Sequence, residues 1–208
     1  MIRARAYLKK AEIELRSWDA LPHSPLKPMG PLSAEFMALG ITDVQGAGRY
    51  LQTLPYGRTA ERADFRAVLR QGRGTCSTKH ALLAALADEQ RLPLDLTLGI
   101  YEMDERNTPG VGVVLARYHL PFIPEAHCYL TNADSRIDVT RCGAEAAESI
   151  ARFLHEETIV PEQIGDYKVA MHRQFMQDWV NHHPDKVQGL GFEALWQVRE
   201  ACIAALAQ

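Results

Sequence analysis

Residues 72–90 join a glycine-rich turn to an apolar run: Gly72-Arg73-Gly74-Thr75-Cys76-Ser77-Thr78-Lys79-His80-Ala81-Leu82-Leu83-Ala84-Ala85-Leu86-Ala87-Asp88-Glu89-Gln90. The two glycines predict a tight loop, and the run after them predicts a helix from about residue 76 to residue 90, ended by Pro93. Leucine and alanine occupy most of the circumference of this helix. A helix with so little polar surface is normally buried, so we expect it to form the centre of the fold.

Cys76 is expected at the first position of this helix. The first turn of a helix carries unpaired N–H groups and about half a positive charge, and both favour a thiolate over a thiol. The same N–H groups can stabilise an oxyanion, and Gly74 lets a substrate approach closely. Cys76 is therefore a candidate nucleophile. The alternative is a small apolar residue packed at a helix start, since free cysteine is among the most buried residue types.

A nucleophilic cysteine needs a base and a group that orients the base, and a predicted hairpin supplies both. If residues 132–135 form the turn, Thr131 pairs with Arg136, and alternation places His127 and Asp138 on one face. Diagonal neighbours lie about 7–8 Å apart at the backbone, within reach of their side chains. The opposite face is apolar and includes Cys128, which we interpret as core packing. The alternative is a half-exposed polar face without a function.

The other segments indicate an α+β fold, with helices first, then strands, then helices. Strands are predicted at 94–101 and 112–118, beside the hairpin at 127–140. Further helices are predicted at 34–39 with Ser33 as the cap, and at 43–54, 59–69, 144–157, 164–180 and 192–207.

Composition narrows the functional classes. The chain has 208 residues, of which 47% are hydrophobic and 24% charged, with a net charge of −3. No basic block points to a nucleic-acid partner, and no apolar run approaches the roughly 20 residues that span a membrane. The N-terminus lacks the apolar core of a secretion signal, so we expect a cytoplasmic protein. Four cysteines in a reducing compartment direct attention to thiol chemistry, not disulfides.

Three segments resemble those of transglutaminase-like proteins, a superfamily of papain-like cysteine enzymes. The run from Gly74 to Leu83 resembles the nucleophile segment, His127-Cys128-Tyr129 resembles the histidine segment, and Asp138-Val139-Thr140 resembles the aspartate segment. They occur in the family's order, although Val139 stands where a proline is common. The resemblance covers roughly residues 50–142.

The resemblance implies a papain-like core, in which the cysteine helix packs on an antiparallel sheet, within a single domain of residues 1–208. The core would span about 50–142, with helical extensions at 1–49 and 143–208. The implied activity is attack of a thiolate on an amide of a peptide, protein or small molecule, without a cofactor. Cys76, His127 and Asp138 are the expected triad. Gln71, Gly74 and Tyr129 are weaker candidates for the oxyanion or substrate site.

Two other functional classes compete with the enzyme. A zinc site would use Cys76, His80, His127 and Cys128, but the last two are adjacent in a strand and point to opposite faces, so we expect no metal. A binding module or pseudoenzyme would keep the fold without turnover. The sequence leaves the substrate, the choice between hydrolysis and acyl transfer, and the oligomeric state open.

Overall fold

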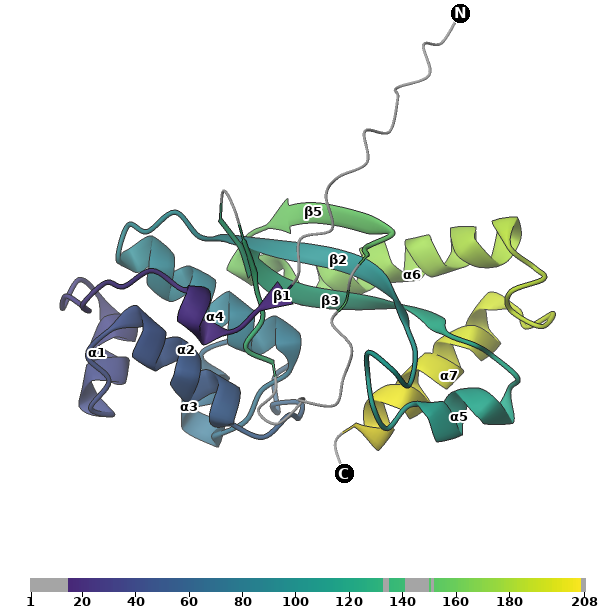
Figure 1. The fold of residues 1–208 in the computed structure, drawn as a ribbon, viewed down its shortest axis with the longest axis horizontal. Helices are drawn as coiled ribbons and strands as arrows, with labels where there is room; N and C mark the ends of the chain where they lie inside the picture. Colours follow the sequence, from purple (N-terminus) through teal and green to yellow (C-terminus); the bar gives the residue numbers. More distant parts are fainter. Residues whose placement is uncertain (1–14, 133–134, 141–149, 151, 207–208) are drawn as a thin grey trace, which may run out of the picture.

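A mixed sheet lies at the centre of the computed structural model, which describes residues 15–132, 135–140, 150 and 152–206 (Figure 1). Within these residues the strand order is β1-β4-β3-β2-β5. The β1–β4 pair is parallel and the other pairs are antiparallel. The strands are β1 (Leu15–Arg16), β2 (Asp95–Met103), β3 (Ile123–Thr131), β4 (Arg136–Ile137) and β5 (His155–Ile159).

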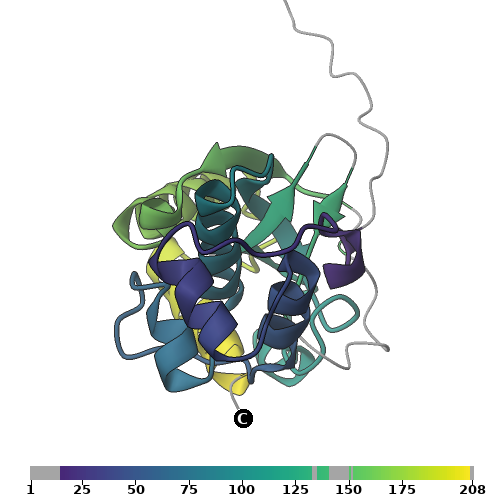
Figure 2. The ribbon, with the colours of Figure 1, turned by 90° about the vertical axis from the view of Figure 1, so that its left-hand side faces the viewer.

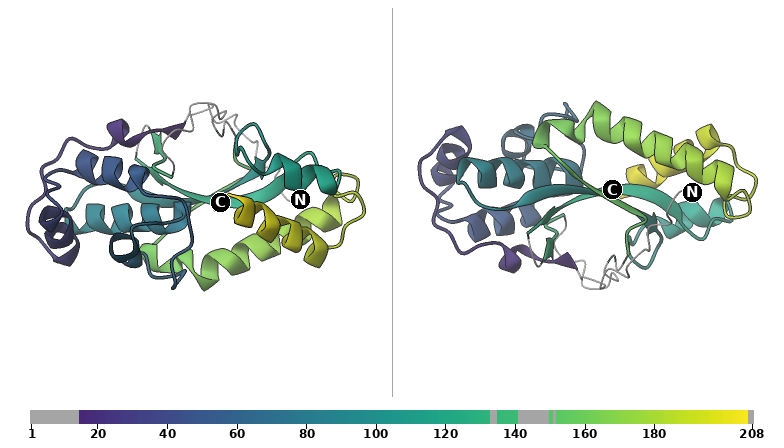
Figure 3. Two further views of the ribbon diagram at one scale, coloured as in Figure 1. Left: turned by 90° about the horizontal axis from the view of Figure 1, so that it is seen from below. Right: turned by 90° about the horizontal axis from the view of Figure 1, so that it is seen from above.

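Helices gather at both ends of the long β2–β3 pair, as Figures 1 and 3 show. At one end are α1 (Pro31–Ala38), α2 (Val44–Thr53), α3 (Ala67–Gln71) and α4 (Cys76–Glu89). At the other end are α5 (Gly112–Arg117) and α7 (Phe192–Ala205), with α6 (Asp166–His182) running along β3 to reach α7. Short 3₁₀ helices occupy Trp18–Ala20 and Pro161–Ile164. The view from the side in Figure 2 shows α1 and α2 packed in front of the sheet.

Two apolar cores share the same pair of strands. Leu96, Leu98 and Ile100 of β2 pack with α1–α4 in the larger core. Tyr101 and Met103 belong to the second core with α5–α7. Because alternate residues of a strand face opposite sides of the sheet, the first three residues contact one group of helices, and Tyr101 and Met103 contact the other group. The expected α+β fold is confirmed, and the segments that form the candidate site lie between the two cores.

The central predictions of secondary structure are confirmed. Helix α4 begins at Cys76, and it lies deep in the larger core as its composition predicts. The hairpin has the expected register, with Thr131 opposite Arg136, although β4 ends at Ile137. Cys128, Ile137 and Val139 lie in the larger core, on the predicted apolar side.

Residues 112–118 were predicted to be a strand, and this is wrong. Gly112–Arg117 is helix α5, in which Val114 and Leu115 pack in the second core with Val111, while Val113 is 68% exposed. The spacing of the buried residues is that of a helix, because positions three and four apart share a helix face. The run of valines suggested a strand since valine favours strands, and contact with α7 overrides that preference.

Three other boundaries also differ. The helix predicted at 59–69 is formed only from Ala67, because the Thr59 hydroxyl and the Gln71 side chain bond to turn backbone at Glu61 and Ala60. Ser33 is the third residue of α1, not its cap; Glu89 accepts the N–H groups of the first turn. The helix predicted at 144–157 ends in strand β5 from His155, and most of its remainder lies outside the described residues.

Candidate active site

The loop before α4 is built to present Cys76 at a helix N-terminus. Thr75 caps the helix, with its side chain accepting the Thr78 N–H while the Thr78 hydroxyl accepts the Thr75 N–H. A Cβ on Gly74 would lie 3.0 Å from each of Val68, Thr78 and Lys79. The turn is therefore packed closely against the helix, and a side chain at Gly74 would push these neighbours away by a few tenths of an ångström. Cys76 is the first helical residue after this turn, and it is 8% exposed.

His127 and Asp138 meet as the hairpin geometry predicts. His127 Nε2 lies 2.7 Å from Asp138 Oδ2. The other carboxylate oxygen accepts the backbone N–H of Thr140 at 2.7 Å and the Thr140 hydroxyl. The Asp138 N–H donates to Arg16 O at 2.8 Å, so β1 holds the aspartate in place. Burial raises the pKa of Asp138, but the charge of His127 and these hydrogen bonds outweigh it and hold that pKa well below its usual range.

Burial raises the pKa of the Cys76 thiol, but the positive charges of Lys168 and His127, together with hydrogen bonding from the His127 side chain and the Cys128 backbone, lower it to about 6. Burial lowers the pKa of His127, whereas Asp138 and the Cys76 thiolate raise it well above its usual range. Both shifts favour a thiolate–imidazolium pair at neutral pH.

A second histidine lies on the far side of the same carboxylate. His80 is fully buried, and its Nε2 accepts the Val139 N–H at 2.9 Å. That bond requires an unprotonated Nε2, so Nδ1 carries the proton and donates to Cys76 O at 2.8 Å. Burial lowers the pKa of His80 to about 4, although Asp138 Oδ1 is only 3.5 Å away. His80 is therefore a neutral bridge that fixes the strand with Asp138 to the helix with Cys76.

Lys79 reinforces this bridge from the next position in α4. Its side chain is fully buried, and Nζ donates to Leu54 O at 2.6 Å and to Thr140 O at 2.8 Å. The segment from Asp138 to Thr140 is thus tied to α4 by two consecutive residues. Two backbone acceptors stabilise the buried ammonium, as a charge in the interior requires.

Tyr129 supports the imidazole from one side. The rings of His127 and Tyr129 are stacked with centroids 6.1 Å apart, and Phe153 stacks on Tyr129 at 4.8 Å. A Cβ on Gly99, which pairs with His127 across the sheet, would lie 2.4 Å from the Phe153 ring. Tyr129 donates its hydroxyl to Glu156. Its position is that of a support for His127 rather than of a substrate contact.

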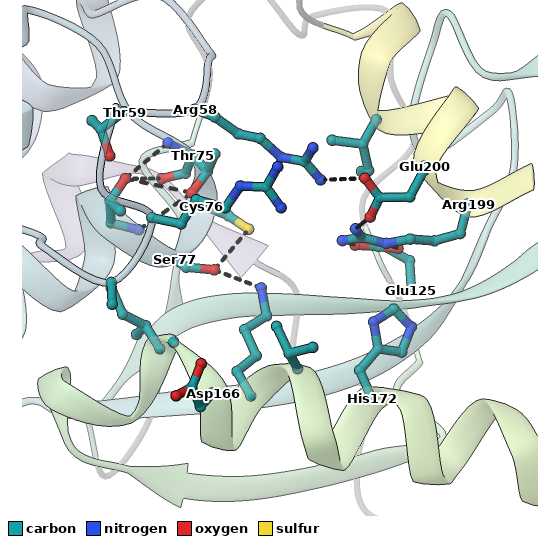
Figure 4. A pocket seen from close by; sticks show the side chains of 18 of the residues that line it. Arg58, Thr59, Thr75, Cys76, Ser77, Glu125, Asp166, His172, Arg199 and Glu200 are labelled. Carbon is teal, nitrogen blue, oxygen red and sulfur yellow. Dashed lines mark hydrogen bonds and ion pairs between the residues drawn. The ribbon is translucent and has the colours of Figure 1, made fainter. Parts of the chain in front are cut away.

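A cavity of about 570 Å³ opens beside the sulfur. Of the three triad residues, Cys76 is the one that lines it, and α6 and α7 provide the opposite wall. Figure 4 shows Cys76 facing this space with Arg58 above it and Glu200 and Arg199 beyond. A cavity of this size accommodates a small molecule or a few residues of a peptide.

Four charged side chains in the cavity wall are linked by ion pairs, and we call them the cavity network: Arg58, Glu200, Arg199 and Glu125. Arg199 forms a two-bond pair with Glu125, with N···O distances of 2.8 and 2.6 Å, and a third bond to Glu200 at 2.6 Å. Glu200 also accepts from Arg58 at 2.9 Å. Burial raises the pKa of Glu125, but Arg199 outweighs it and lowers that pKa. The network therefore presents fixed charges to the cavity.

The weaker candidates divide in their placement. Gly74 lies against Thr78 and Lys79 of the first turn of α4, and Tyr129 lies beside the imidazole of His127. Gln71 is exposed at the end of α3, and its side-chain oxygen accepts the Ala60 N–H at 3.1 Å, so the structure does not bring it to the sulfur. Sequence reasoning missed Lys79, Lys168 and the bridging role of His80. An ionisable residue in an apolar helix pattern was the available signal for Lys79 and His80.

Within the part of the chain that the structure describes, no group of three or more histidine, cysteine, aspartate or glutamate side chains is arranged to hold a metal ion. Cys128 points into the larger core, away from His127, as strand alternation requires. No helix in the described ranges has the length and apolar character needed to cross a membrane.

Comparisons of the chain with protein-family models, with curated proteins and with solved structures returned no match. The likeness to transglutaminase-like proteins thus stays a prediction from three short motifs. The function of this chain is therefore inferred from the geometry of its site and not from similarity to known proteins.

Proposed function

We propose that the protein is a cysteine-nucleophile enzyme that cleaves or transfers the acyl group of an amide. The observation that carries this proposal is the His127 Nε2–Asp138 Oδ2 hydrogen bond of 2.7 Å beside a cysteine at a helix start, whose thiol pKa is lowered to about 6 while the pKa of the imidazole is raised. Catalytic groups are commonly those whose environment shifts their pKa values towards the working pH. Buried cysteines without this function have raised values, as Cys128 and Cys202 do.

The residues have distinct roles in the proposed reaction. The Cys76 thiolate attacks the amide carbonyl carbon, a C–S bond forms, and the carbonyl electron pair moves to oxygen. The Cys76 backbone N–H, without an intrahelical acceptor at the helix start, stabilises that oxyanion. As the C–N bond breaks, the His127 imidazolium gives its proton to the leaving amine. Asp138 holds the imidazole orientation throughout.

The second half of the reaction releases the acyl group. Neutral His127 takes a proton from water or from an amine, which attacks the thioester carbonyl. The C–S bond then breaks and the thiolate is restored beside the imidazolium. Water gives a carboxylate, and an amine gives a new amide. The substrate is a peptide, protein or small amide whose acyl part enters the cavity beside Cys76.

Alkylation of Cys76 by iodoacetamide, analysed by peptide mass spectrometry across pH, tests the thiolate–imidazole pair. In the wild type we expect half-maximal reactivity near pH 6. In His127→Ala we expect reactivity at pH 6.5 to fall by about tenfold, because one cation and one hydrogen bond to the sulfur are lost. Cys128 and Cys202 serve as internal controls. A wild-type Cys76 midpoint near that of an ordinary thiol, about 8.5, contradicts the proposal.

Acylation with p-nitrophenyl acetate tests turnover. We expect an acetyl group on Cys76 that the wild type releases and that His127→Ala retains, because release requires a base for water. Acetylation that is equally stable in both proteins would support a binding protein on this fold.

A further inference from the structure

Lys168 lines the cavity together with Cys76, and the proposed reaction gives it no role. We propose that Lys168 is an electrostatic partner of the Cys76 thiolate that keeps the nucleophile charged independently of the protonation state of His127. The inference rests on the proposed function, and it concerns the same site.

The geometry joins the lysine to the sulfur through one hydroxyl. Lys168 is near the start of α6 and only 9% exposed. Its Nζ donates to Ser77 Oγ at 2.5 Å, and Ser77 Oγ lies 3.8 Å from Cys76 Sγ. Figure 4 shows Ser77 directly below the sulfur at the cavity wall. Cys76 and Ser77 are consecutive in the first turn of α4. The cap at Thr75 that fixes this turn therefore also fixes the Ser77 hydroxyl to which Lys168 donates.

The surroundings of this ammonium are incomplete without an anion. Within the described residues, no carboxylate lies within 4.0 Å of Lys168 Nζ, and its hydrogen-bond acceptor is a neutral hydroxyl. Glu125, a carboxylate of the same cavity wall, is engaged by Arg199. Removing a charge from water costs several kcal/mol unless an opposite charge compensates it. The Cys76 thiolate is the anion in the right place.

Lys79 provides the contrast on the helix that carries the cysteine. Both lysines are buried beside the site, but Lys79 donates to two backbone carbonyls and ties segments together. Lys168 donates to one side-chain hydroxyl at a cavity and faces a titratable thiol. The first arrangement is that of a structural lysine, and the second is that of a charge held for a partner.

Several charged or titratable groups surround the sulfur, and the charges of Lys168 and His127 both lower its pKa. Burial lowers the pKa of Lys168, but Cys128, Cys76 and Glu125 raise it, against a smaller opposing effect of Arg199. The groups that interact with this pair are His127 and Cys128 on β3, Glu125 on β3, Tyr101 on β2, His172 on α6 and Arg199 on α7.

The role has a chemical reason. When His127 has given its proton to the leaving amine, the imidazole no longer carries a charge. Lys168 remains charged, because its pKa is raised. A permanent cation beside the sulfur makes it a better leaving group when the thioester breaks, since the thiolate that departs is stabilised.

The pH dependence of Cys76 alkylation by iodoacetamide tests this, in wild type, Lys168→Met, Lys168→Arg and His127→Ala. We expect the Lys168→Met midpoint to rise by about one to two pH units, as the loss of an adjacent opposite charge does, and Lys168→Arg to stay near the wild type. Lys27→Met is the matched control, because Lys27 is exposed and bonds to Gln90 at the opposite end of α4. The midpoint of Cys76 alkylation should not move in this variant.

The outcomes separate this inference from the proposed function. A Lys168→Met midpoint that stays near pH 6 while His127→Ala moves upward overturns the inference and leaves the function standing. A wild-type midpoint near 8.5 overturns both. If circular dichroism shows that Lys168→Met does not fold, Ser77→Ala replaces it, because this variant keeps the lysine and removes the hydroxyl that accepts its hydrogen bond. We expect a rise of about half a unit there, and an unchanged midpoint overturns the inference.

Discussion

The predicted triad and the cavity network are two sets of charged groups on either side of Cys76, and they differ in what they can do. Asp138 of the triad lies between two imidazoles whose pKa values move in opposite directions, His127 upward and His80 downward to about 4. In the cavity network, two carboxylates alternate with two guanidiniums. Arginine does not deprotonate in proteins. The proposed triad therefore contains a side chain that can exchange a proton, whereas the lowered carboxylate pKa values and the arginines keep the charges of the cavity network fixed.

The histidines sharpen the comparison further. Asp138 raises the pKa of both rings, yet burial prevails at His80 and the charges prevail at His127. The difference is that His80 receives a hydrogen bond from a backbone N–H, while His127 contacts a thiol that can become an anion. Proximity to a carboxylate therefore does not make a base; the second neighbour of each ring decides.

Breaking the cavity network should have the largest effect on stability. We expect Glu125→Gln to lower the free energy of unfolding by about 3–5 kcal/mol, because it leaves Arg199, whose side chain is only 12% exposed, without its two-bond partner. Urea denaturation measures this. Glu193→Gln is the matched control on α7, the helix that carries Arg199: the ion pair of Glu193 with Arg173 is exposed and is expected to contribute less than about 1 kcal/mol. Equal losses in the two variants would show that Glu125 is no more than a surface charge.

The second prediction separates His80 from His127 through the pH dependence of stability. The pKa of His80 is about 4 in the folded protein and about 6.5 in the unfolded chain. The unfolded state therefore binds the extra proton between these values, so stability is lost as pH falls from 6.5 towards 4. His172, with a pKa also lowered to about 4 by burial, contributes in the same direction.

We expect His80→Gln to make this acid slope about 1.4 kcal/mol per pH unit less steep near pH 5, because one titrating group is gone. Its stability at pH 7 should fall by about 1–3 kcal/mol through the bonds to Cys76 O and Val139 N. Urea denaturation at several pH values measures both. His127 has a raised pKa, and its contribution is instead lost as pH rises, so His127→Ala should leave the acid slope unchanged. An unchanged slope in His80→Gln would mean that His80 is protonated in the folded state.

The residues of the proposed triad could be predicted from the sequence, whereas the cavity network could not. The triad comes from short segments around Cys76, His127 and Asp138, where a glycine turn, an apolar helix and strand alternation each impose local geometry. The cavity network joins Arg58 and Glu125 to two residues of α7, and only the tertiary fold brings them together. No periodicity marks such pairs. The strand prediction for residues 112–118 failed for a related reason, because their valines satisfy a strand pattern until the contact with α7 is known.

The smallest expected effect concerns the turn that presents the nucleophile. Gly74→Ala places a Cβ 3.0 Å from three side chains, and the Val68 and Lys79 contacts are with fully buried residues. We expect a loss of about 1–3 kcal/mol in the free energy of unfolding from overpacking. Gly191→Ala, where a Cβ meets nothing within 4 Å, should cost no more than about 1 kcal/mol, the loss expected from alanine at the α7 cap. The alkylation midpoint of Cys76 should also rise in Gly74→Ala, because displacing Thr78 and Lys79 moves the helix start relative to His127. A destabilised protein with an unchanged midpoint would show that the turn supports the fold alone, and that the position of Cys76 is set by His80 and Lys79 from within α4.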